Sequence, residues 1–363
     1  MNRPHVVILG AGPAGSTAAL ALLSDYQVSL VDPCEPGKRP FRVGETLPAA
    51  GKRILLELGL WEAFSKQDHL PVTQRRTYWG SSVQQTQDSF LNLDGPDYLL
   101  DRPQFENFLC QEAIHRGATP IAAKLTDCKK QLTHWQIGLS NQETLLADWV
   151  IDATGRRASF AVRAGEERRH LDRLVAHWSL SPSLPSQPPG ITTMSTENGW
   201  WYQASLPSSH QLIIFFTDAD QAQPTRSPLT ENWSLSSPKK TAAHSAILSA
   251  SIGHRWHAIG DASLAFDPLS SQGLFHALYT GLRSREVIQK QDDKFYQKEI
   301  VQIFSAYQDH YSFYYNAEQR WSDASFWQRR HQSPLTYEKT TTIQKTGHSH
   351  SGKQPSSLQP TYR

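Results

Sequence analysis

Cysteine is scarce in this sequence, and the positions of the cysteines fit neither a disulfide framework nor a metal site. The 363 residues contain three cysteines, Cys34, Cys110 and Cys128. Their number is odd, they lie far apart, and no two of them form a Cys-x-x-Cys pair. This pattern excludes a disulfide framework and a cysteine zinc site, and we expect no metal site. It also indicates a reducing compartment, so we predict a cytoplasmic protein.

Long apolar runs are absent as well. No stretch of about 20 apolar residues occurs, so we expect no transmembrane helix. The segment 1–24 resembles a secretion signal in having an early Arg3 and an apolar run, but glycine and proline interrupt it between residues 10 and 15. A second strand-like segment, Val28–Val31, follows it closely. We therefore interpret the N-terminus as part of the folded protein.

Neither sign of charge dominates. Lys and Arg number 36 and Asp and Glu number 34, which gives a formal net charge of +2. Segment 331–363 holds four Lys or Arg residues and one acidic residue, so residues 1–330 carry a net charge of −1. A body so close to neutral argues against a nucleic-acid binder that depends on neutralising phosphates. Segment 331–363 has few aliphatic residues and is predicted to be disordered.

What the N-terminus does contain is a nucleotide-binding pattern. The apolar run His5–Leu9 predicts a buried strand, Gly10-Ala-Gly12-Pro-Ala-Gly15 follows it, and a predicted helix and second strand lead to Asp32. The first glycine would make a tight turn, the second would admit a pyrophosphate, and the third would let the helix pack on the strand. The helix N-terminus would offer N–H groups to the diphosphate, and Asp32 would accept hydrogen bonds from a ribose. A glycine turn without a ligand is the alternative, which the strand–helix–strand context disfavours.

Three later segments narrow the choice of nucleotide. They are Asp101-Arg102-Pro-Gln-Phe105, the run from Trp149 to Asp152-Ala-Thr-Gly155, and Trp256–Gly273, which reads WHAIGDASLAFDPLSSQG. In this order the motifs resemble the FAD-dependent monooxygenase superfamily with the p-hydroxybenzoate hydroxylase fold. That superfamily also contains flavin halogenases and prenyl-chain reductases. The resemblance spans roughly residues 4–290 and implies FAD as the cofactor.

The fold that the resemblance implies is α/β (α+β overall), with a Rossmann-like FAD-binding lobe and an inserted antiparallel β-sheet lobe for the substrate. Segments 1–72, 99–170 and 251–330 would form the FAD-binding lobe, the last one including C-terminal helices. Segments 73–98 and 171–250 would form the β-sheet lobe, because residues 175–216 alternate and are rich in Trp and Tyr. The periodicity predicts helices over 49–64, 102–116, 273–290 and 294–330, and a strand over 256–260.

The resemblance also implies a set of FAD contacts. Arg102 would contact the diphosphate or ribityl region, Asp261 would bind ribityl hydroxyls, and Pro268 would lie against the isoalloxazine and position it. Backbone N–H groups of residues 271–273, at the start of a helix, would stabilise negative charge at the flavin N1/O2 edge. The complete set of expected FAD-binding residues is Gly10, Gly12, Pro13, Ala14, Gly15, Asp32, Pro33, Gly44, Glu45, Arg102, Gly155, Gly260, Asp261, Pro268, Ser271, Gln272, Gly273 and Leu274.

A narrower resemblance rests on Gly44-Glu-Thr-Leu-Pro48, on Gly199-Trp-Trp-Tyr-Gln-Ala-Ser-Leu-Pro207 and on Asp267-Pro-Leu-Ser-Ser-Gln-Gly273. These segments are similar to halogenase-like flavoproteins that build the cysteine tryptophylquinone cofactor of bacterial quinoprotein oxidases. The likeness implies hydroxylation of an electron-rich aromatic, a tryptophan or indole, through a C4a-hydroperoxyflavin. The substrate would be a quinoprotein oxidase precursor, and NAD(P)H or an electron-transfer protein would be the external reductant.

Other activities stay open at this point. Halogenases carry a Trp-x-Trp-x-Ile-Pro signature, from which the sequence WWYQASLP departs, and no lysine here has the glycine-flanked setting that halogenases use. A flavin halogenase or a prenyl-chain reductase is nevertheless an alternative within enzymes. A non-catalytic FAD-binding assembly factor is an alternative outside them.

Several side chains have a functional and a structural interpretation. Trp200, Trp201 and Tyr202 would either wall an aromatic substrate pocket or belong to the core of a sheet. Glu45 would either act on the substrate as a catalytic residue or cap the following helix. His276 is more typical of a packed histidine. The arginines between 156 and 173 would form a solvated face or a docking site for NAD(P)H phosphate or an acidic partner.

Overall fold

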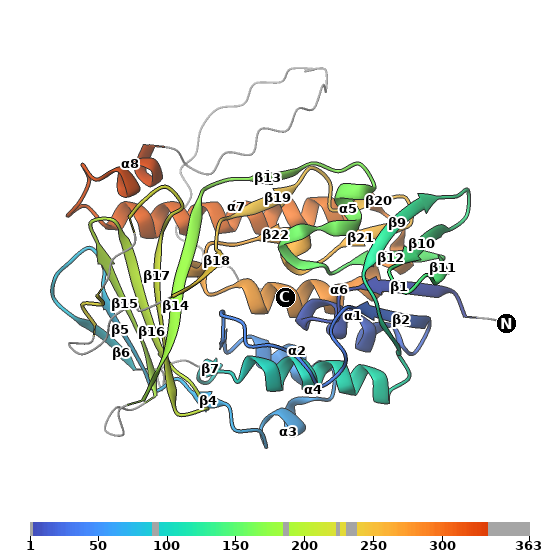
Figure 1. The fold of residues 1–363 in the computed structure, drawn as a ribbon, viewed down its shortest axis with the longest axis horizontal. Coiled ribbons are helices and arrows are strands. Elements are labelled where there is room, and N and C mark those ends of the chain that lie inside the picture. The colour runs from blue at the N-terminus through green and yellow to red at the C-terminus, as the bar shows by residue number, and fades with distance from the viewer. Residues whose placement is uncertain (1–2, 89–93, 184–188, 223–225, 230–237, 333–363) are drawn as a thin grey trace, which may run out of the picture.

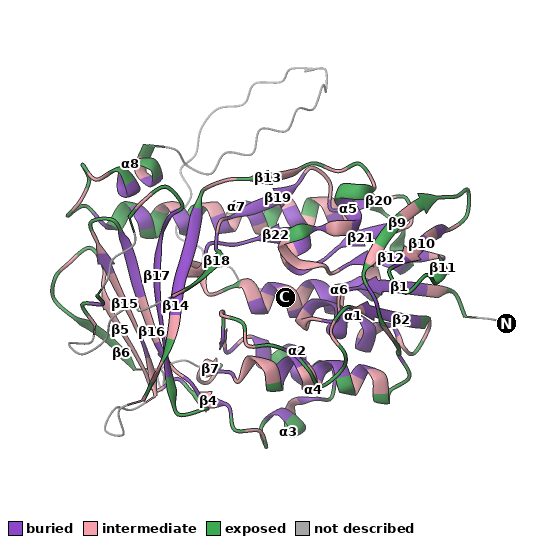
Figure 2. Ribbon diagram, in the orientation of Figure 1, coloured by how far each residue is buried: buried purple, intermediate pink, exposed green. Residues whose placement is uncertain are grey.

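The structure is a computed structural model, and it describes residues 3–88, 94–183, 189–222, 226–229 and 238–332. The segment 331–363, predicted to be disordered, lies outside the described residues from position 333 onwards. Two sheets face each other across the molecule, one near the N-terminus and one at the far end, and helices fill the space between and around them (Figure 1). Figure 2 shows that the middle strands of both sheets are buried.

A six-stranded sheet carries the N-terminal motif. Its order is β20-β21-β12-β1-β2-β8, and its strands are parallel except for β20. The strands are β1 (His5–Leu9), β2 (Gln27–Asp32), β8 (Thr119–Ala122), β12 (Trp149–Asp152), β20 (Ile252–Gly253) and β21 (Trp256–Ala258). Residues 6–9 are almost wholly buried, as expected of a strand covered on both faces. Parallel strands place their carboxyl ends at one edge, so the segments after β1, β2 and β12 meet there.

A seven-stranded sheet forms the second half. Its order is β18-β14-β17-β16-β15-β5-β6, and every pair is antiparallel except β15 with β5. The strands are β5 (Gln74–Tyr78), β6 (Gln85–Asp88), β14 (Leu174–Pro182), β15 (Gly190–Thr196), β16 (Gly199–Ser205), β17 (His210–Asp218) and β18 (Lys239–Ala242). The two sheets confirm the predicted fold class, whereas the exact limits of the two lobes stay a prediction.

Three small sheets complete the described strands, and the sequence analysis predicted none of them as strands. Their orders are β11-β10-β9, β13-β19-β22 and β3-β7-β4. Their strands are β3 (Thr46–Leu47), β4 (Leu70–Pro71), β7 (Tyr98–Leu99), β9 (Leu125–Lys130), β10 (Trp135–Leu139), β11 (Thr144–Ala147), β13 (Arg168–His170), β19 (Ala246–Leu248) and β22 (Leu264–Ala265). Most are two to four residues long, too short for a period of two to show in the sequence.

Two predicted helices are each divided in the structure. The expected helix over 49–64 is α2 (Gly51–Glu57) and α3 (Trp61–Phe64), because Gly59 between them has a φ of +68°. The expected helix over 294–330 is α7 (Asp293–Ala317) and α8 (Ser325–Gln332). The remaining helices are α1 (Pro13–Leu22), α4 (Arg102–His115), α5 (Ser159–Arg163) and α6 (Gly273–Lys290). The start and end of α6 agree with the prediction.

Helix α7 joins the two halves (Figure 1). Near its start, Tyr296 and Ile300 pack in the core of the six-stranded sheet and its helices. Farther along, Tyr307, Tyr311 and Tyr315, four residues apart and therefore on one face, pack in the core of the seven-stranded sheet. One helix thus packs in the cores of both sheets and fixes their relative position.

Candidate functional site

A cavity of about 910 Å³ lies between the two sheets. Segments at the carboxyl ends of β1, β2 and β12 line one part of it, and β14, β16, β17 and β18 line another. The loop before α6 lines a third part. Segments some 250 residues apart in the chain therefore share one cavity, as the predicted FAD site requires.

The N-terminal glycine turn has the geometry that its sequence predicts. Gly10 has a φ of +105°, and its N–H donates to the Val31 carbonyl oxygen at 2.7 Å. A Cβ on Gly15 would lie 1.8 Å from the Gly10 oxygen, so this glycine is required where α1 passes β1. A Cβ on Gly12 would meet nothing within 4 Å, and Gly12 lines the cavity at the N-terminus of α1. The turn thus leaves space for a ligand against the helix N-terminus.

Asp32 lies at the cavity with its carboxylate already oriented. Its Oδ2 accepts from the Ala11 N–H at 2.7 Å, and its Oδ1 accepts from the Cys34 N–H at 2.8 Å. Arg39 Nη1 lies 3.5 Å from Asp32 Oδ2, and that guanidinium is 1% exposed. Two backbone donors and a buried cation therefore hold a negative carboxylate at the end of β2, where a ribose could reach its remaining lone pairs.

An ion pair between Arg102 and Glu106 lies next to Arg39. Arg102 begins α4, donates through Nη2 to Glu106 Oε1 at 2.5 Å and through Nη1 to the Gly44 carbonyl. Among the described residues, Nε of Arg102 and both Nε and Nη2 of Arg39 are buried without a hydrogen-bond partner. Arg102 lines the cavity, whereas Arg39 does not and instead pairs with Asp32 and Glu106.

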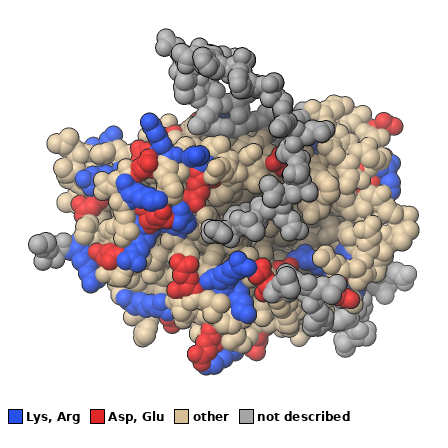
Figure 3. Space-filling model, turned by 180° about the vertical axis from the view of Figure 1, so that it is seen from behind, with Lys and Arg blue, Asp and Glu red and all other residues tan. Residues whose placement is uncertain are grey.

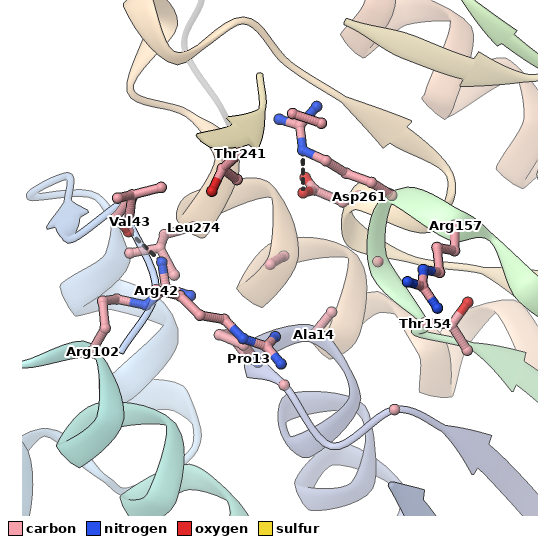
Figure 4. Close-up of a pocket in the computed structure, with 18 of the residues that line it drawn as sticks. Pro13, Ala14, Arg42, Val43, Arg102, Thr154, Arg157, Thr241, Asp261 and Leu274 are labelled. Atoms are coloured by element: carbon pink, nitrogen blue, oxygen red, sulfur yellow. Dashed lines mark hydrogen bonds and ion pairs between the residues drawn. The ribbon is translucent and has the colours of Figure 1, made fainter. Parts of the chain in front are cut away.

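Two further arginines point into the cavity beside the start of α1. Figure 4 shows Arg42 and Arg157 directed toward Pro13 and Ala14 from opposite walls. No hydrogen bond or ion pair within the described chain holds either guanidinium, and both residues are exposed. Cations without a protein partner, placed at a helix N-terminus, fit an anionic diphosphate. Together with the open Gly12 and the oriented Asp32, they show that the residues present fit FAD.

The loop before α6 closes the opposite part of the cavity. Asp261, Pro268, Ser271, Gln272, Gly273 and Leu274 all line it, as does Asp267. Asp267 is buried, and its carboxylate accepts from the Leu269 N–H and from the Tyr315 hydroxyl, each at 2.8 Å. Burial, together with the nearby Asp172 carboxylate, raises the pKa of Asp267 to about 7. These bonds fix the shape of the loop from inside.

The wall formed by the seven-stranded sheet is aromatic, and one buried carboxylate adjoins it. Trp200 and Tyr202, two residues apart on β16, line the cavity, as does Glu45, which directly precedes β3 and contacts Tyr202. The Tyr202 hydroxyl donates to Glu45 Oε1 and accepts from the Thr46 hydroxyl, and the Gly44 N–H donates to Glu45 Oε2. Burial and the adjacent Glu45 carboxylate raise the pKa of Tyr202 well above its usual value, so the phenol stays a donor.

Three predicted site residues are not brought to this cavity. Gly15 serves the helix–strand contact described above, and Gly260 packs against Ala14 and α6. Trp201 lies on the other face of its sheet, because successive residues of a strand point to opposite sides. It packs there with Ile213 and Phe215. The remaining predicted residues line the cavity: Gly10, Gly12, Pro13, Ala14, Asp32, Pro33, Gly44, Glu45, Arg102, Gly155, Asp261, Pro268, Ser271, Gln272, Gly273, Leu274, Trp200 and Tyr202.

His276 is a packed histidine, as its sequence context favoured. It is buried, its ring lies against Phe266 with centroids 5.0 Å apart, and its Nε2 lies 3.3 Å from Ser263 Oγ. Burial lowers its pKa to about 4, so the ring is neutral near pH 7.

Sequence reasoning missed Arg39, Arg42 and Trp178 as parts of this region. The segment Gly37-Lys-Arg-Pro-Phe-Arg42, between β2 and the Gly44–Pro48 motif, was a usable signal, because basic residues in a loop after a Rossmann-type strand can reach a phosphate. Trp178 lines the cavity from β14, and nothing in its neighbourhood distinguished it from core.

The arginines between 156 and 173 do not form one surface. Arg156 pairs with Asp261 at 3.5 Å, while Arg168 donates to the Asp261 carbonyl at 2.6 Å and to those of residues 262 and 263. Arg169 pairs with Glu167. Figure 3 shows, from behind, acidic and basic side chains intermixed over the half that holds the six-stranded sheet. No described helix is long and apolar enough to cross a membrane, and no described group of three His, Cys, Asp or Glu side chains could hold a metal.

Three features together define a flavoprotein of the monooxygenase and halogenase type. They are the glycine turn at the cavity, the oriented Asp32 after the second strand, and the antiparallel sheet across the cavity. The sequence profile described as tryptophan halogenase matches residues 76–357, so the chain belongs to the tryptophan halogenase family. The match includes nearly all of the seven-stranded sheet and strands β8, β12, β20 and β21 of the six-stranded sheet.

Individual relatives agree with this assignment. The chain is 28% identical over 362 residues to a protein described as a FAD-dependent oxidoreductase, LodB, of Marinomonas mediterranea, and the match covers 91% of this chain and 98% of that protein. The structure of QhpG, a peptidyl tryptophan dihydroxylase essential for tryptophylquinone cofactor biogenesis, matches with a TM-score of 0.72 and 24% identity, covering 90% of this chain and 78% of QhpG. CmlS, a flavin-dependent halogenase, matches with a TM-score of 0.78 and 22% identity, covering 91% and 68%. The predicted superfamily, fold, oxidoreductase class and FAD cofactor are thereby confirmed.

Proposed function

We propose that this protein is an FAD-dependent monooxygenase that hydroxylates a tryptophan side chain within a partner protein during quinone cofactor biogenesis. The observation that carries the proposal is an aromatic cavity wall, Trp200 and Tyr202, with the buried carboxylate of Glu45 hydrogen-bonded to Tyr202 beside it. A flat, electron-rich ring such as an indole can stack against such a wall. QhpG, similar in fold, acts on a peptidyl tryptophan, which supports the choice of substrate.

FAD, when bound and reduced, would supply the activation of dioxygen. The overall reaction takes one C–H bond, one O₂, two electrons and two protons to one C–OH bond and one water. A nicotinamide nucleotide or an electron-transfer protein would provide the electrons. Gly12 and the α1 N-terminus would hold the diphosphate, Asp32 the adenosine ribose, and residues 268–273 the flavin ring edge. The chain itself would position the reactants and exclude water.

Glu45 would orient the substrate and accept its proton. One lone-pair direction on each Glu45 oxygen is already used, by the Tyr202 hydroxyl and by the Gly44 N–H. The remaining directions are available to an indole N–H at the cavity. A negative carboxylate there would favour the positive charge that develops on an indole ring as it is oxygenated, and it would take up the proton that the ring then loses.

Halogenation is the second candidate, and the family assignment favours it. The lining of the cavity supports hydroxylation instead. Halogenases relay hypohalous acid through a lysine, and Lys124 is the one lysine among the described residues that line this cavity. Lys124 follows β8, whose Ala122 pairs with Asp32, and therefore lies at the adenosine side, away from Trp200 and Tyr202.

The test uses the purified full chain loaded with FAD, with NADH or NADPH in air, and N-acetyl-tryptophanamide or a tryptophan-containing peptide. We expect a hydroxylated product, with one oxygen atom incorporated from ¹⁸O₂ per hydroxyl group. Glu45→Gln should lower turnover by at least tenfold, a loss of ~1.4 kcal/mol in transition-state stabilisation. Lys66→Gln, at an exposed site paired only with Glu62, is the control and should leave turnover unchanged.

Other products would replace the proposal. A brominated or chlorinated indole that appears only with added halide would assign halogenation. Saturation of a polyprenyl chain would assign a reductase. FAD binding without oxygen uptake, in the presence of reductant and precursor protein, would assign an assembly factor without turnover.

A further inference from the structure

One edge of the seven-stranded sheet borders the cavity. The strand order ends at β18 on one side and at β6 on the other. All four residues of β18 are exposed, and Thr241 and Ala242 line the cavity together with Ala243, which follows the strand. In Figure 4 the Thr241 side chain lies at the upper wall of the cavity. No residue of β6 lines it.

The register of β18 shows which of its backbone groups are unpaired. The Ala243 N–H donates to the Leu174 carbonyl at 3.0 Å, so these residues form a hydrogen-bonded pair of an antiparallel ladder. Such pairs alternate, so Thr241 and Lys239 also bond toward β14, whereas Lys240 and Ala242 direct their N–H and C=O groups away from it. The pairing of β14 with β17 on its other side agrees with this alternation. There the Ala219 N–H donates to the Arg173 carbonyl, so odd-numbered residues of β14 bond toward β17 and even-numbered ones toward β18.

The outward groups are free within the described chain. The register leaves these N–H and C=O groups of Lys240 and Ala242 without a bond to β14, and no turn, loop or cap hydrogen bond between described residues involves them. The alternation places the Ala242 side chain on the sheet face opposite Thr241, so the backbone of Ala242 is what borders the cavity. Unpaired backbone N–H and C=O groups along the edge of a sheet are suited to bind a second extended peptide backbone.

Two exposed lysines lie on β18 itself, their side chains on opposite faces of the sheet. Lys239 and Lys240 are exposed, and the Lys239 ammonium lies 5.0 Å from the centre of the Trp178 ring, which lines the cavity. Lysines commonly keep an edge strand from pairing with other chains. At a cavity mouth the same charges select an acidic partner.

We infer that β18 is the docking strand for an extended, acidic segment of the partner protein, which adds to the sheet edge and presents its aromatic side chain to the cavity. The inference rests on the proposed function for the nature of the substrate. Backbone hydrogen bonds to Lys240 and Ala242 would hold the segment largely independently of its sequence, and the cavity would select the aromatic residue. Alternate residues of the segment would face the cavity, so one tryptophan is presented at a time.

The first test measures binding, separately from turnover. A fluorescein-labelled peptide with one tryptophan flanked by glutamates is titrated with the FAD-loaded chain and followed by fluorescence anisotropy. N-methylation of the peptide backbone, moved one residue at a time, should weaken binding about tenfold at alternate positions and have little effect between them. Equal effects at adjacent positions, or no binding of the unmodified peptide, would overturn the inference.

The second test changes the protein. Ala242→Pro removes an N–H that faces away from β14, so the sheet keeps its own hydrogen bonds, and proline is tolerated on an edge in this orientation. It should weaken peptide binding about tenfold, whereas Ala242→Ser, which keeps the N–H, should bind like the parent. Circular dichroism and thermal unfolding show whether the proline variant folds, and the N-methyl series decides the question if it does not.

Charge is tested by the double variant Lys239→Glu with Lys240→Glu. Its affinity for the glutamate-flanked peptide should fall at least tenfold at low salt and less at high salt. Lys130→Glu, an exposed residue of β9 outside the cavity lining, is the matched control. Unchanged affinity in the double variant would overturn the choice of an acidic segment.

Failure of this inference and failure of the proposed function can be told apart. If β18 is the docking strand, Ala242→Pro impairs peptide turnover but not the oxidation of N-acetyl-tryptophanamide, which has too little backbone to add as a strand. Register-dependent peptide binding without any oxygenation would refute the proposed chemistry and leave the docking strand standing.

Discussion

Two glycines of the N-terminal turn, three positions apart, should respond to a side chain in opposite ways. At Gly12 a Cβ would meet no atom within 4 Å, and the backbone there (φ −70°, ψ −172°) is open to any L-residue. At Gly15 a Cβ would lie 1.8 Å from the Gly10 oxygen and 3.2 Å from the Ala153 Cβ. We therefore expect Gly12→Val to fold and lose FAD, and Gly15→Ala to lose the fold.

The magnitudes follow from these distances. The Gly12→Val side chain would occupy the cavity beside the α1 N-terminus, where the diphosphate is expected, so FAD affinity should fall at least 100-fold, or ~2.7 kcal/mol. The unfolding free energy of the FAD-free protein should change by ~0.5 kcal/mol or less, because a Cβ at this position meets no protein atom within 4 Å and the side chain extends into the cavity. In Gly15→Ala the backbone oxygen cannot move aside without disturbing β1 and α1, so we expect a loss of ~3 kcal/mol or more.

The assay compares FAD-free proteins, because bound FAD would itself add stability. Urea unfolding followed by circular dichroism gives the unfolding free energy, and quenching of FAD fluorescence gives the affinity. A Gly12→Val protein that folds and retains a yellow colour through gel filtration would refute the placement of the diphosphate. A Gly15→Ala protein as stable as the parent would refute the close approach of α1 to the turn.

Two further predictions separate neighbouring effects. Trp200→Phe should raise the KM for an indole substrate severalfold, because Trp200 lines the cavity, whereas Trp201→Phe should lower thermal stability and leave KM unchanged; equal kinetic effects of both would contradict the assignment of faces. Burial lowers the pKa of His257 to about 3, so its folded form binds fewer protons than the unfolded chain and its contribution to stability is lost as pH falls from about 6.5 toward 3. His257→Gln, which can still accept from the Trp149 indole N–H that His257 Nδ1 accepts at 2.8 Å, should flatten the acid limb of urea stability measured against pH, and an unchanged limb would contradict the assignment.

The parts of the site that a short motif encodes were predictable. The turn over residues 10–15 contains the glycines and the proline that its backbone requires, and the loop over 267–273 contains an acid, a proline and a glycine. Their local geometry could therefore be predicted without knowing the rest of the chain. The start of α6 was predictable for the same reason, because Gly273 ends the loop motif; its end, at a Gln291 whose φ is +50°, agrees with the predicted limit. Local rules suffice where local sequence fixes the backbone.

The parts that depend on distant contacts were not predictable. Trp200 and Trp201 are chemically identical, and only the register of β16 on β17 decides which one faces the cavity. Arg39 gains its meaning from Asp32 and Glu106, which come from a different strand and a different helix. Strands β8, β9 and β11 are short or half-exposed and show little apolar alternation, so nothing in their sequence separated them from loops. Strand β10, WQIGL, does alternate, and the sequence analysis missed it.

The two halves of the cavity are joined by a chain of hydrogen bonds as well as by packing. The Trp200 indole N–H donates to the Tyr315 hydroxyl at 3.2 Å, and that hydroxyl donates to Asp267 Oδ2 at 2.8 Å. The Asp267 N–H in turn donates to the Tyr307 hydroxyl, which lies on the same face of α7 as Tyr315. Side chains of α7 therefore hydrogen-bond both to the wall expected to hold the substrate and to the loop expected to hold the flavin. Since buried chains of polar groups tolerate little displacement, the spacing between this aromatic wall and the 267–273 loop is fixed by one helix rather than by the separate folding of two lobes.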